Sequence, residues 1–442
     1  MKIHAVLTAL ALASAAAAVQ AQSNEELKSL LDQAMKTIQD LQSRVKALEQ
    51  GKAAPAVPAG EWGAPVVAPG SKAQDGAPDA GKARAEVYGQ AMLDAIYDFR
   101  RMNPDRNATM RPSQIPVNCP GDAGCGQNGA TILSVRQSSL GVRGFSPTAL
   151  GMLKTDLSFD LFAADGGTDV HWLNAWAELG PYGAGQTYSL FMDIDVFPNT
   201  IDYWGPSGMV FVRNPQLRVT PLARDGMTLS FALEAPNSAL DTGKLTAIDP
   251  ALVGITAWNR APDVTAALRF DADWGHVMAA GVLREVGYQN PSRADNQPSG
   301  HRTGYGLNLA GALNLFGKDK LSWQLVSGRA IASYMNDGGI DLAPDASLRA
   351  ETVSSLGWLA YYGHTWSDKW TSAIGYSEHR QDNTGGQFGN AFRKGSYASA
   401  NLLYAPAKNL TTGAEFVWGR HEYKDGSSAP DYRLQFSTKA AF

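Results

Sequence analysis

Charged side chains recur on one face of alternating segments, and they are the residues best placed to do chemistry. One lysine and four arginines lie opposite apolar rows, at Arg143, Lys154, Arg269, Arg284 and Arg433. An arginine stays charged at any relevant pH and binds a carboxylate through two parallel hydrogen bonds. Several such residues converging on a narrow, partly dehydrated opening would attract small anions, and dianions more than monoanions.

Two further arginines belong to the same candidate site. Arg136 lies near the expected mouth, but its parity conflicts with the alternation of the following segment unless a bulge intervenes. Arg213 follows the polar stretch 195–208, which carries Asp195 and Asp202. A basic wall facing this acidic stretch would produce a transverse electric field. The alternative is a mixed lining, in which the arginines only pair with carboxylates across the wall, at Asp156, Asp160, Asp193 and Glu234.

The sequence lacks the motifs of common enzymes. It has no glycine loop for phosphate, no H-E-x-x-H and no G-x-S-x-G, and its seven histidines are scattered. We therefore predict no catalytic residue, no cofactor and no metal site, although a Ser/His/acid set assembled by folding stays open as an alternative. The formal net charge of −4 gives no reason to expect nucleic acid as a partner.

Residues 1–21 are typical of a secretory signal peptide, with Lys2 and His4 ahead of an apolar stretch and small residues before Ala21. A short membrane anchor is the alternative. Export places the chain in an oxidising compartment, where thiols pair. The two cysteines, Cys119 and Cys125, lie within "CPGDAGC" and are predicted to form a local disulfide. A metal site would need more ligands nearby.

A heptad pattern follows the signal peptide, over residues 22–50. Its seam consists of Leu27, Leu31, Ala34, Ile38, Leu41, Val45 and Leu48. This spacing predicts a coiled-coil oligomerisation helix, and a helix packed on its own domain is the alternative. Residues 51–85 are rich in Ala, Pro and Gly and predict a tether. A helix on such a tether has little reason to pack on its own domain, so we favour self-association.

From residue 86 to residue 442 the pattern changes to strict alternation, as in "VYGQAMLDAIYDF". About sixteen such segments are separated by short turns and long polar loops in turn. Past the signal, no run of apolar residues approaches the eighteen that a spanning helix needs. The pattern predicts an all-β fold: an antiparallel transmembrane β-barrel of about 16 strands, preceded by an N-terminal periplasmic coiled-coil helix.

The last segment, "DYRLQFSTKAAF", is itself a strand with one apolar and one polar face. In a closed barrel the last strand pairs with the first, because an unpaired edge inside lipid would be too costly. We therefore expect Phe442 to lie in the aromatic girdle at the periplasmic rim and to act as an assembly signal. Other aromatic residues also fit girdle positions, namely Trp323, Trp370, Tyr376, Tyr404 and Trp418.

Several stretches resemble the DcaP-like family of trimeric outer-membrane porins. They are the heptad helix, the Ala/Pro tether, "EVYGQAMLDAIYDFRRMNPDRNATMRPSQIP", "ILSVRQSSLGVRG" and the terminal Phe442, which together span the mature chain. The resemblance implies a homotrimer with a periplasmic coiled coil that takes up small anionic solutes such as dicarboxylates. The loop closed by Cys119 and Cys125 and the length of the tether look individual to this chain, and no constriction geometry is carried over.

These observations predict a passive diffusion channel in the outer membrane of a Gram-negative bacterium, with a constriction narrowed by the third long loop. Its expected partners are outer-membrane lipid and lipopolysaccharide, other copies of itself, small anionic solutes and the barrel-assembly machinery. A sugar porin is one alternative, with Trp172, Trp176 and Tyr203 as an aromatic path. An adhesin or receptor barrel with a closed lumen and an outer-membrane enzyme are the others.

Overall fold

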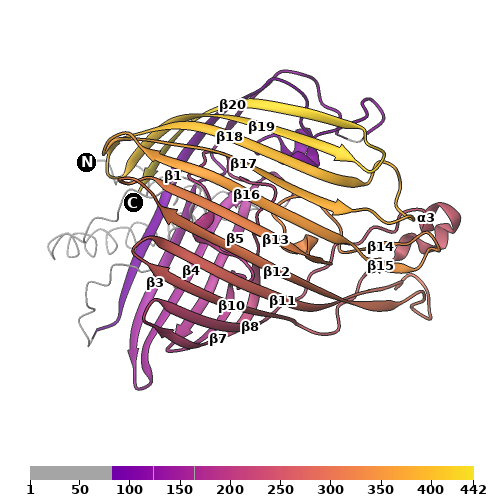
Figure 1. Ribbon diagram of the computed structural model, residues 1–442, viewed down its shortest axis with the longest axis horizontal. Helices are drawn as coiled ribbons and strands as arrows, with labels where there is room; N and C mark the ends of the chain where they lie inside the picture. The colour runs from indigo at the N-terminus through magenta and orange to yellow at the C-terminus, as the bar shows by residue number, and fades with distance from the viewer. Residues whose placement is uncertain (1–81, 123, 164) are drawn as a thin grey trace, which may run out of the picture. The chain divides into compact units, whose positions relative to one another are not determined.

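The alternating segments form strands because their apolar and polar side chains separate onto opposite faces of an extended backbone. The computed structural model describes residues 82–122, 124–163 and 165–442, in which sixteen strands of seven to sixteen residues form one antiparallel barrel (Figure 1). They are β1 (Arg84–Asp98), β3 (Ser139–Thr148), β4 (Gly151–Phe162), β5 (Thr168–Leu179), β6 (Tyr182–Tyr188), β7 (Arg213–Arg224), β8 (Met227–Glu234), β10 (Asp263–Ala272), β11 (Gly275–Gln289), β12 (Gly300–Asn314), β13 (Lys320–Arg329), β16 (Ser354–Thr365), β17 (Trp370–Asp382), β18 (Phe392–Ala407), β19 (Leu410–Tyr423) and β20 (Ser428–Ala441).

Short elements complete the described part of the chain. Strand β2 (Ala130–Ser134) continues the line of β3, and β9 (Thr256–Ala257) pairs with the end of β11. Strands β14 (Leu342–Pro344) and β15 (Ala350–Thr352) form a separate hairpin. The helical turns are η1 (Pro104–Arg106), η2 (Pro112–Gln114), η3 (Ile194–Val196), α3 (Leu245–Ile248), η4 (Pro250–Gly254) and η5 (Ala332–Tyr334). No helix in the described residues is long and apolar enough to cross a membrane.

The barrel closes between its first and last strands. Strand β1 pairs with β20 from Gln90↔Ala441 to Asp98↔Arg433, and its other edge pairs with β3 and then with β2. Closure leaves the barrel strands without a free edge, as a lipid environment requires. The sequence-based prediction of about sixteen antiparallel strands is confirmed. The predicted signal peptide, coiled-coil helix and most of the tether lie outside the described residues.

Phe442 extends the closing ladder by one residue. Its N–H donates to the carbonyl of Gly89 at 3.0 Å, and the Gly89 N–H donates to the Phe442 carbonyl at 3.1 Å. The ring lies near Gly89, where an added Cβ would be 2.9 Å from a ring carbon of Phe442. The side chain itself is 64% exposed, on the outer face of the barrel.

We expect removal of Phe442 to slow barrel assembly, because two hydrogen bonds of the closing pair and an outward aromatic side chain are lost together. Each hydrogen bond contributes about 0.5–1.5 kcal/mol. The folded fraction over time, measured by heat-modifiable gel mobility, checks this. Phe442→Tyr keeps the backbone pair and an aromatic ring, and should assemble at the wild-type rate. Equal assembly rates for the truncated and full chains would contradict the prediction.

Connections of different length are sorted to the two ends of the barrel. One end, here called the turn end, carries the tight connections 149–150, 180–181, 225–226, 273–274, 315–319, 366–369 and 408–409. The other, the loop end, carries 99–129, 163–167, 189–212, 235–262, 290–299, 330–353, 383–391 and 424–427. This sorting confirms the expected plan of an outer-membrane barrel. The polar stretch 421–431 is mostly strand, because only residues 424–427 separate β19 from β20. The polar stretch 379–394 keeps a loop at its centre, residues 383–391, between β17 and β18.

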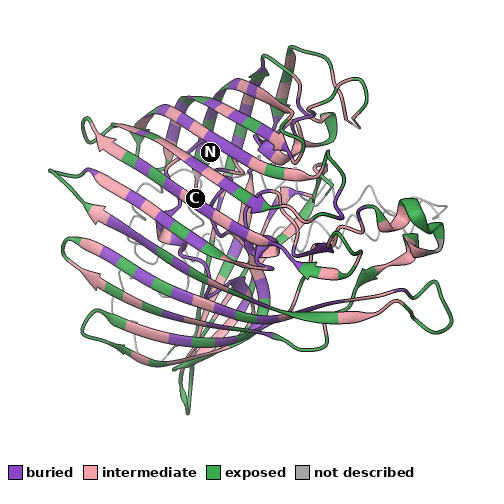
Figure 2. Cartoon of the chain, turned by 45° about the vertical axis from the view of Figure 1, so that its right-hand side comes forward, coloured by how far each residue is buried: buried purple, intermediate pink, exposed green. Residues whose placement is uncertain are grey.

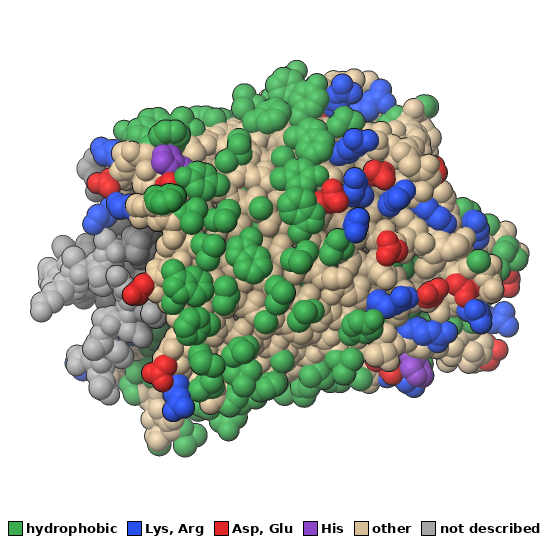
Figure 3. All heavy atoms as spheres, viewed as in Figure 1, with side chains coloured by type: hydrophobic (Ala, Val, Ile, Leu, Met, Phe, Trp, Pro, Cys, Tyr) green, Lys and Arg blue, Asp and Glu red, His purple; other side chains and the backbone are tan. Residues whose placement is uncertain are grey.

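The two faces of the wall differ as the alternation predicts (Figure 2). Along β1, Leu93 and Tyr97 are about half exposed outward, whereas Asp94 and Asp98 are each 1% exposed toward the lumen. On the face seen in Figure 3, the outward apolar side chains form a broad band, and charged residues gather beyond it at the loop end. Such a band, bounded by aromatic residues, is the surface that lipid tails contact.

Candidate functional site

The connection between β6 and β7, residues 189–212, lies inside the barrel and is called here the inward loop. It is third among the loop-end connections. Its side chains Phe191, Val196 and Met209 are completely buried. They pack in one apolar cluster with Met110 and Ile115 of loop 99–129, together with Ile331 and Tyr334 of loop 330–353. Apolar loop residues therefore fill part of the lumen and narrow it.

The inward loop lies directly against the opposite wall of the barrel. A Cβ at Gly208 would be 2.1 Å from the carbonyl oxygen of Glu378, so only glycine fits there. The Gly208 N–H donates to Ser377 Oγ at 2.8 Å. The loop also pairs with loop 330–353, because the Asn336 N–H donates to the Met209 carbonyl at 2.8 Å.

Buried Glu415 on β19 holds the tip of the inward loop. Its carboxylate accepts the backbone N–H groups of Ile201 at 2.9 Å and Asp202 at 2.8 Å, and the Asn401 amide at 2.8 Å. The predicted pore residue Asp202 is fully buried and accepts the Met110 N–H at 2.9 Å. Asp202 thus joins the inward loop to loop 99–129 and has no exposed surface for a solute.

Two adjoining cavities remain beside the inward loop along the β1–β7 wall. The wall cavity, of about 280 Å³, is lined by Tyr88, Asp160, Tyr203, Arg213 and Lys439 among others. The mouth cavity, of about 90 Å³, lies nearer the loop end and is lined by Arg106, Arg111 and Arg136. His171, Tyr203 and Trp204 line both cavities. Together these two spaces are called here the basic path.

Positive charge dominates the basic path. Its lining contains five cations, three in the mouth cavity and two in the wall cavity, and one carboxylate, Asp160. That carboxylate accepts the Tyr203 hydroxyl and the Phe162 N–H, and it lies 3.0 Å from His171 Nδ1. Hydrogen bonds thus hold Asp160 against the wall.

Arg111 and Arg213 are fixed in different ways. Arg111 lies 3.8 Å from the ring centre of Trp204 and 3.2 Å from Asp337 of loop 330–353. Arg213 lies over the Tyr188 ring at 4.2 Å and donates to its hydroxyl. No carboxylate of the described residues lies within ion-pair distance of Arg213, and its Nε lacks a hydrogen-bond partner there. The Tyr188 ring and hydroxyl therefore hold the Arg213 guanidinium in place, while its Nε–H has no partner among the described residues.

Arg136 is released from the strand alternation by a break in the ladder. Strand β2 ends at Ser134 and β3 begins at Ser139, so residues 135–138 follow no strand parity. This break resolves the conflict noted in the sequence. The Arg136 Nε donates to Thr168 Oγ1 at 3.0 Å. Sequence reasoning missed Arg106, Arg111 and Lys439, which also line the basic path.

The other predicted cations lie in mixed surroundings. Arg143 stacks on Tyr88 at 4.3 Å and lies 3.8 Å from Asp156, and Lys154 lies 4.0 Å from Glu178. Arg269 contacts Asp193 at 3.3 Å, Asp195 at 2.7 Å and Asp271 at 2.9 Å. Arg269 lines a turn-end cavity of about 430 Å³, which holds two arginines and four carboxylates. That cavity and the basic path therefore carry charge of opposite sign.

Arg284 and Arg433 are buried side chains that a solute could not reach. Arg284 lies 3.2 Å from Asp263 and 3.6 Å from Asp341, and it binds loop 330–353 to the wall. Arg433 lies 2.8 Å from Asp98 across the β1–β20 seam. Among the aromatic residues considered for a sugar path, Trp176 is buried toward the lumen, but Trp172 is 54% exposed on the outer face.

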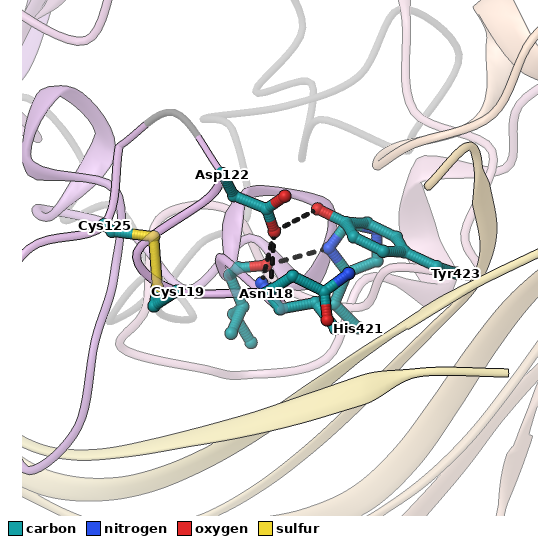
Figure 4. Close-up of a disulfide and its surroundings, with 8 residues drawn as sticks. Asn118, Cys119, Asp122, Cys125, His421 and Tyr423 are labelled. Atoms are coloured by element: carbon teal, nitrogen blue, oxygen red, sulfur yellow. Dashed lines mark hydrogen bonds between the residues drawn. A yellow bond between two sulfur atoms is a disulfide. The ribbon is translucent and has the colours of Figure 1, made fainter. Parts of the chain in front are cut away.

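The cysteines are joined as expected, and the loop that they close is fixed to the barrel (Figure 4). Within that loop, Asp122 accepts the N–H groups of Val117 and Asn118 at 2.9 and 2.7 Å and the Tyr423 hydroxyl at 2.8 Å. His421 Nδ1 lies 2.9 Å from the Ile115 carbonyl. Partial burial acts to raise the pKa of Asp122, but these hydrogen bonds together leave it below the usual value.

Asp122 should make the ordering of this loop depend on pH. Because the folded pKa is depressed, the stabilisation is present above the unfolded value of about 3.9 and is lost as pH falls through the folded pKa. We expect hydrogen-exchange protection of the Val117 and Asn118 amides to persist at pH 5 and to fall below about pH 4. Asp122→Ala should lack this protection at every pH. Protection that is unchanged at low pH would exclude Asp122 as the cause.

Comparison with known proteins agrees with this architecture. Residues 68–255 match the family model described as DcaP outer membrane protein. The outer membrane channel DcaP of Acinetobacter baumannii superimposes with a TM-score of 0.71 at 18% identity, over 81% of this chain and 97% of that one. Over the matched residues, the chain is similar to DcaP.

More distant barrels share the fold with this DcaP-like chain. An anion-selective porin from Comamonas acidovorans matches with a TM-score of 0.50 at 10% identity, over 82% of this chain and 100% of that one. OmpF of Salmonella typhi matches with a TM-score of 0.50 at 12% identity, over 81% and 97%. No curated protein sequence matches the chain. The family-model match over residues 68–255 and the shared barrel fold are those of outer-membrane, porin-like channels.

Proposed function

We propose that this DcaP-like channel admits small solutes by passive diffusion and prefers anions, dicarboxylates among them. The charge of the basic path carries the proposal: five cations and one hydrogen-bonded carboxylate line it. Arginines bind carboxylates with two parallel hydrogen bonds, so a dianion gains more than a monoanion. A lining in which several charges share the solute also keeps each contact weak enough to release it.

The basic path and the turn-end cavity carry opposite charge, which supports a transverse electric field across the inward loop. The basic path lies on one side, and Asp193 and Asp195 of the inward loop contact Arg269 on the other. Such a field would orient a solute that carries charge at one end. Since Arg269 is already shared by three carboxylates, the turn-end cavity has little capacity for a further anion.

We propose further that residues 22–50 form a periplasmic coiled coil that supports a homotrimer. Strand β1 begins at Arg84 beside Phe145, close to the 149–150 turn, so the tether reaches the barrel at its turn end. In outer-membrane barrels the short turns face the periplasm. On this proposal, a coiled coil of residues 22–50 would form in the periplasm, where it would meet other copies of the chain.

The sign of the reversal potential across a KCl gradient tests the solute class. Purified full-length protein in planar bilayers should prefer chloride, and a small dicarboxylate should reduce the chloride current more than a neutral sugar of equal size. Both effects should weaken in 1 M salt, where the Debye length is about 3 Å. A preference for cations would instead indicate that the acidic turn-end cavity sets the ion selectivity. Stronger block by the sugar would favour a sugar porin, and absence of conductance a closed adhesin or receptor barrel.

A further inference from the structure

A group of cations faces outward at the loop end of β17, β18 and β19. The basic patch consists of Arg380 on β17, Arg393 and Lys394 on β18, and Arg420 on β19. Arg380 pairs across the sheet with Lys394, and Lys394 pairs with Glu422. Arg420 lies opposite Ser396, one outward position nearer the membrane. The patch therefore belongs to the rigid wall and not to a loop.

The basic patch lies directly beyond the lipid-facing surface. One outward row below Arg420, Tyr376 and Trp418 stack with ring centres 6.5 Å apart. Below them, Ile374 and Phe416 are about half exposed in the apolar band. Two residues of a strand span about 7 Å, so the guanidinium groups lie at the level of lipid headgroups above an aromatic girdle. Figure 3 shows this change from apolar to charged side chains toward the loop end.

Neighbouring carboxylates form ion pairs with some cations of the basic patch, but not with all of them. Lys394 lies 3.5 Å from Glu422 and 3.9 Å from Glu378, and Arg393 lies 3.7 Å from Glu422. Arg380 and Arg420 form no ion pair with the described residues, although Asp382 is also exposed at the end of β17. Arg420 donates to Ser428 Oγ at 2.7 Å. Two exposed guanidinium groups therefore flank the Lys394 network with their charge unmatched.

We propose that the basic patch binds the phosphate groups of an anionic glycolipid headgroup in the outer leaflet. Guanidinium groups bind phosphate through paired hydrogen bonds, and exposed cations at this height meet headgroups before any soluble partner. The loop end faces the outside in barrels of this plan, which identifies the leaflet. Tyr376 and Trp418 would contact the upper part of the acyl chains of the same lipid.

Binding of defined lipids to the detergent-purified full-length chain tests the proposal by native mass spectrometry. The probe is a bisphosphorylated glycolipid, compared with the same glycolipid after removal of its phosphates. The variant Arg380→Gln with Arg420→Gln should bind the bisphosphorylated form about 30-fold more weakly, since each cation beside an anionic surface contributes about fivefold. The matched control, Arg293→Gln with Arg349→Gln, removes two exposed loop-end arginines outside the patch and should bind as wild type does.

Heat-modifiable mobility and conductance of the double variant should equal those of wild type, because both side chains point away from the lumen. Equal affinity for the phosphorylated and dephosphorylated glycolipids would overturn the proposal, because the apolar wall alone would then hold the lipid. Unchanged affinity in the double variant would overturn it as well. A loss of oligomer mass in that variant, without a change in lipid affinity, would instead assign the patch to contact with a second copy.

Discussion

Replacing Arg136 and Arg213 together with glutamate should abolish the proposed preference of the channel for anions. Five cations and one carboxylate give the basic path a formal charge of +4, and each reversal removes two units, which leaves zero. Charges about 4 Å from a permeating ion at an effective dielectric constant of 20 interact with about 4 kcal/mol. The chloride-to-potassium permeability ratio should therefore fall by tenfold or more, toward one, in reversal-potential measurements.

A matched control separates the local charge from the net charge of the protein. Arg224→Glu with Arg349→Glu makes the same formal change at two side chains that are about three-quarters exposed and lie outside the basic path. This control should leave the permeability ratio unchanged. Arg143→Glu should have a smaller effect than Arg213→Glu, because Asp156 already lies near the Arg143 guanidinium. A wild-type ratio in the Arg136 and Arg213 double variant would show that ions do not follow the basic path.

Glu415→Ala should free the tip of the inward loop and widen the channel. The carboxylate accepts two backbone N–H groups of the loop, and hydrogen bonds to a charged group contribute roughly 1.5–3 kcal/mol each. The substitution leaves these buried donors without their acceptor, so the tip should detach while the strand ladder stays intact. Single-channel conductance should rise and become noisier, and solutes too large for the wild type should pass.

Glu415→Gln is the conservative control for this prediction. Its amide oxygen still accepts one hydrogen bond, so the closed form of the loop should be partly kept and the rise in conductance should be smaller. Heat-modifiable mobility should show that both variants form complete barrels. If Glu415→Ala conducts like the wild type, then the apolar cluster around Phe191 and Met209 holds the loop without help from the carboxylate.

The strand alternation predicted which face of the wall each side chain lies on. It did not predict whether the side chain is buried there or which residues it contacts. Arg284 and Arg433 lie on the lumen side as predicted, yet both are buried against carboxylates. Arg284 contacts Asp263 on the neighbouring strand β10, but its other partner, Asp341, and the Arg433 partner, Asp98, lie on elements that are not adjacent in sequence. Period-two patterns contain no information on such distant pairs. Whether a lumen-facing side chain is buried depends on which loops fill the lumen. The period-two pattern of the strands carries no information on those loops.

The residues that sequence reasoning missed lie mainly in loop 99–129. A polar loop outside a barrel has no need of buried apolar side chains, so the methionines and Ile115 in this stretch were a usable signal. Met110 and Ile115 are in fact completely buried in the lumen. That placement brings Arg106 and Arg111 to the mouth cavity. Apolar residues within a supposedly external loop thus indicate a loop that folds inward.

The anchoring of the inward loop also joins parts of the chain that are far apart in the sequence. Ile201 and Asp202 depend on a carboxylate more than two hundred positions later, on the next-to-last strand of the barrel. Until β19 and the inward loop are part of one barrel, the tip of the loop lacks this anchor. A fixed constriction therefore requires strands from both halves of the sequence, whichever part of the chain assembles first.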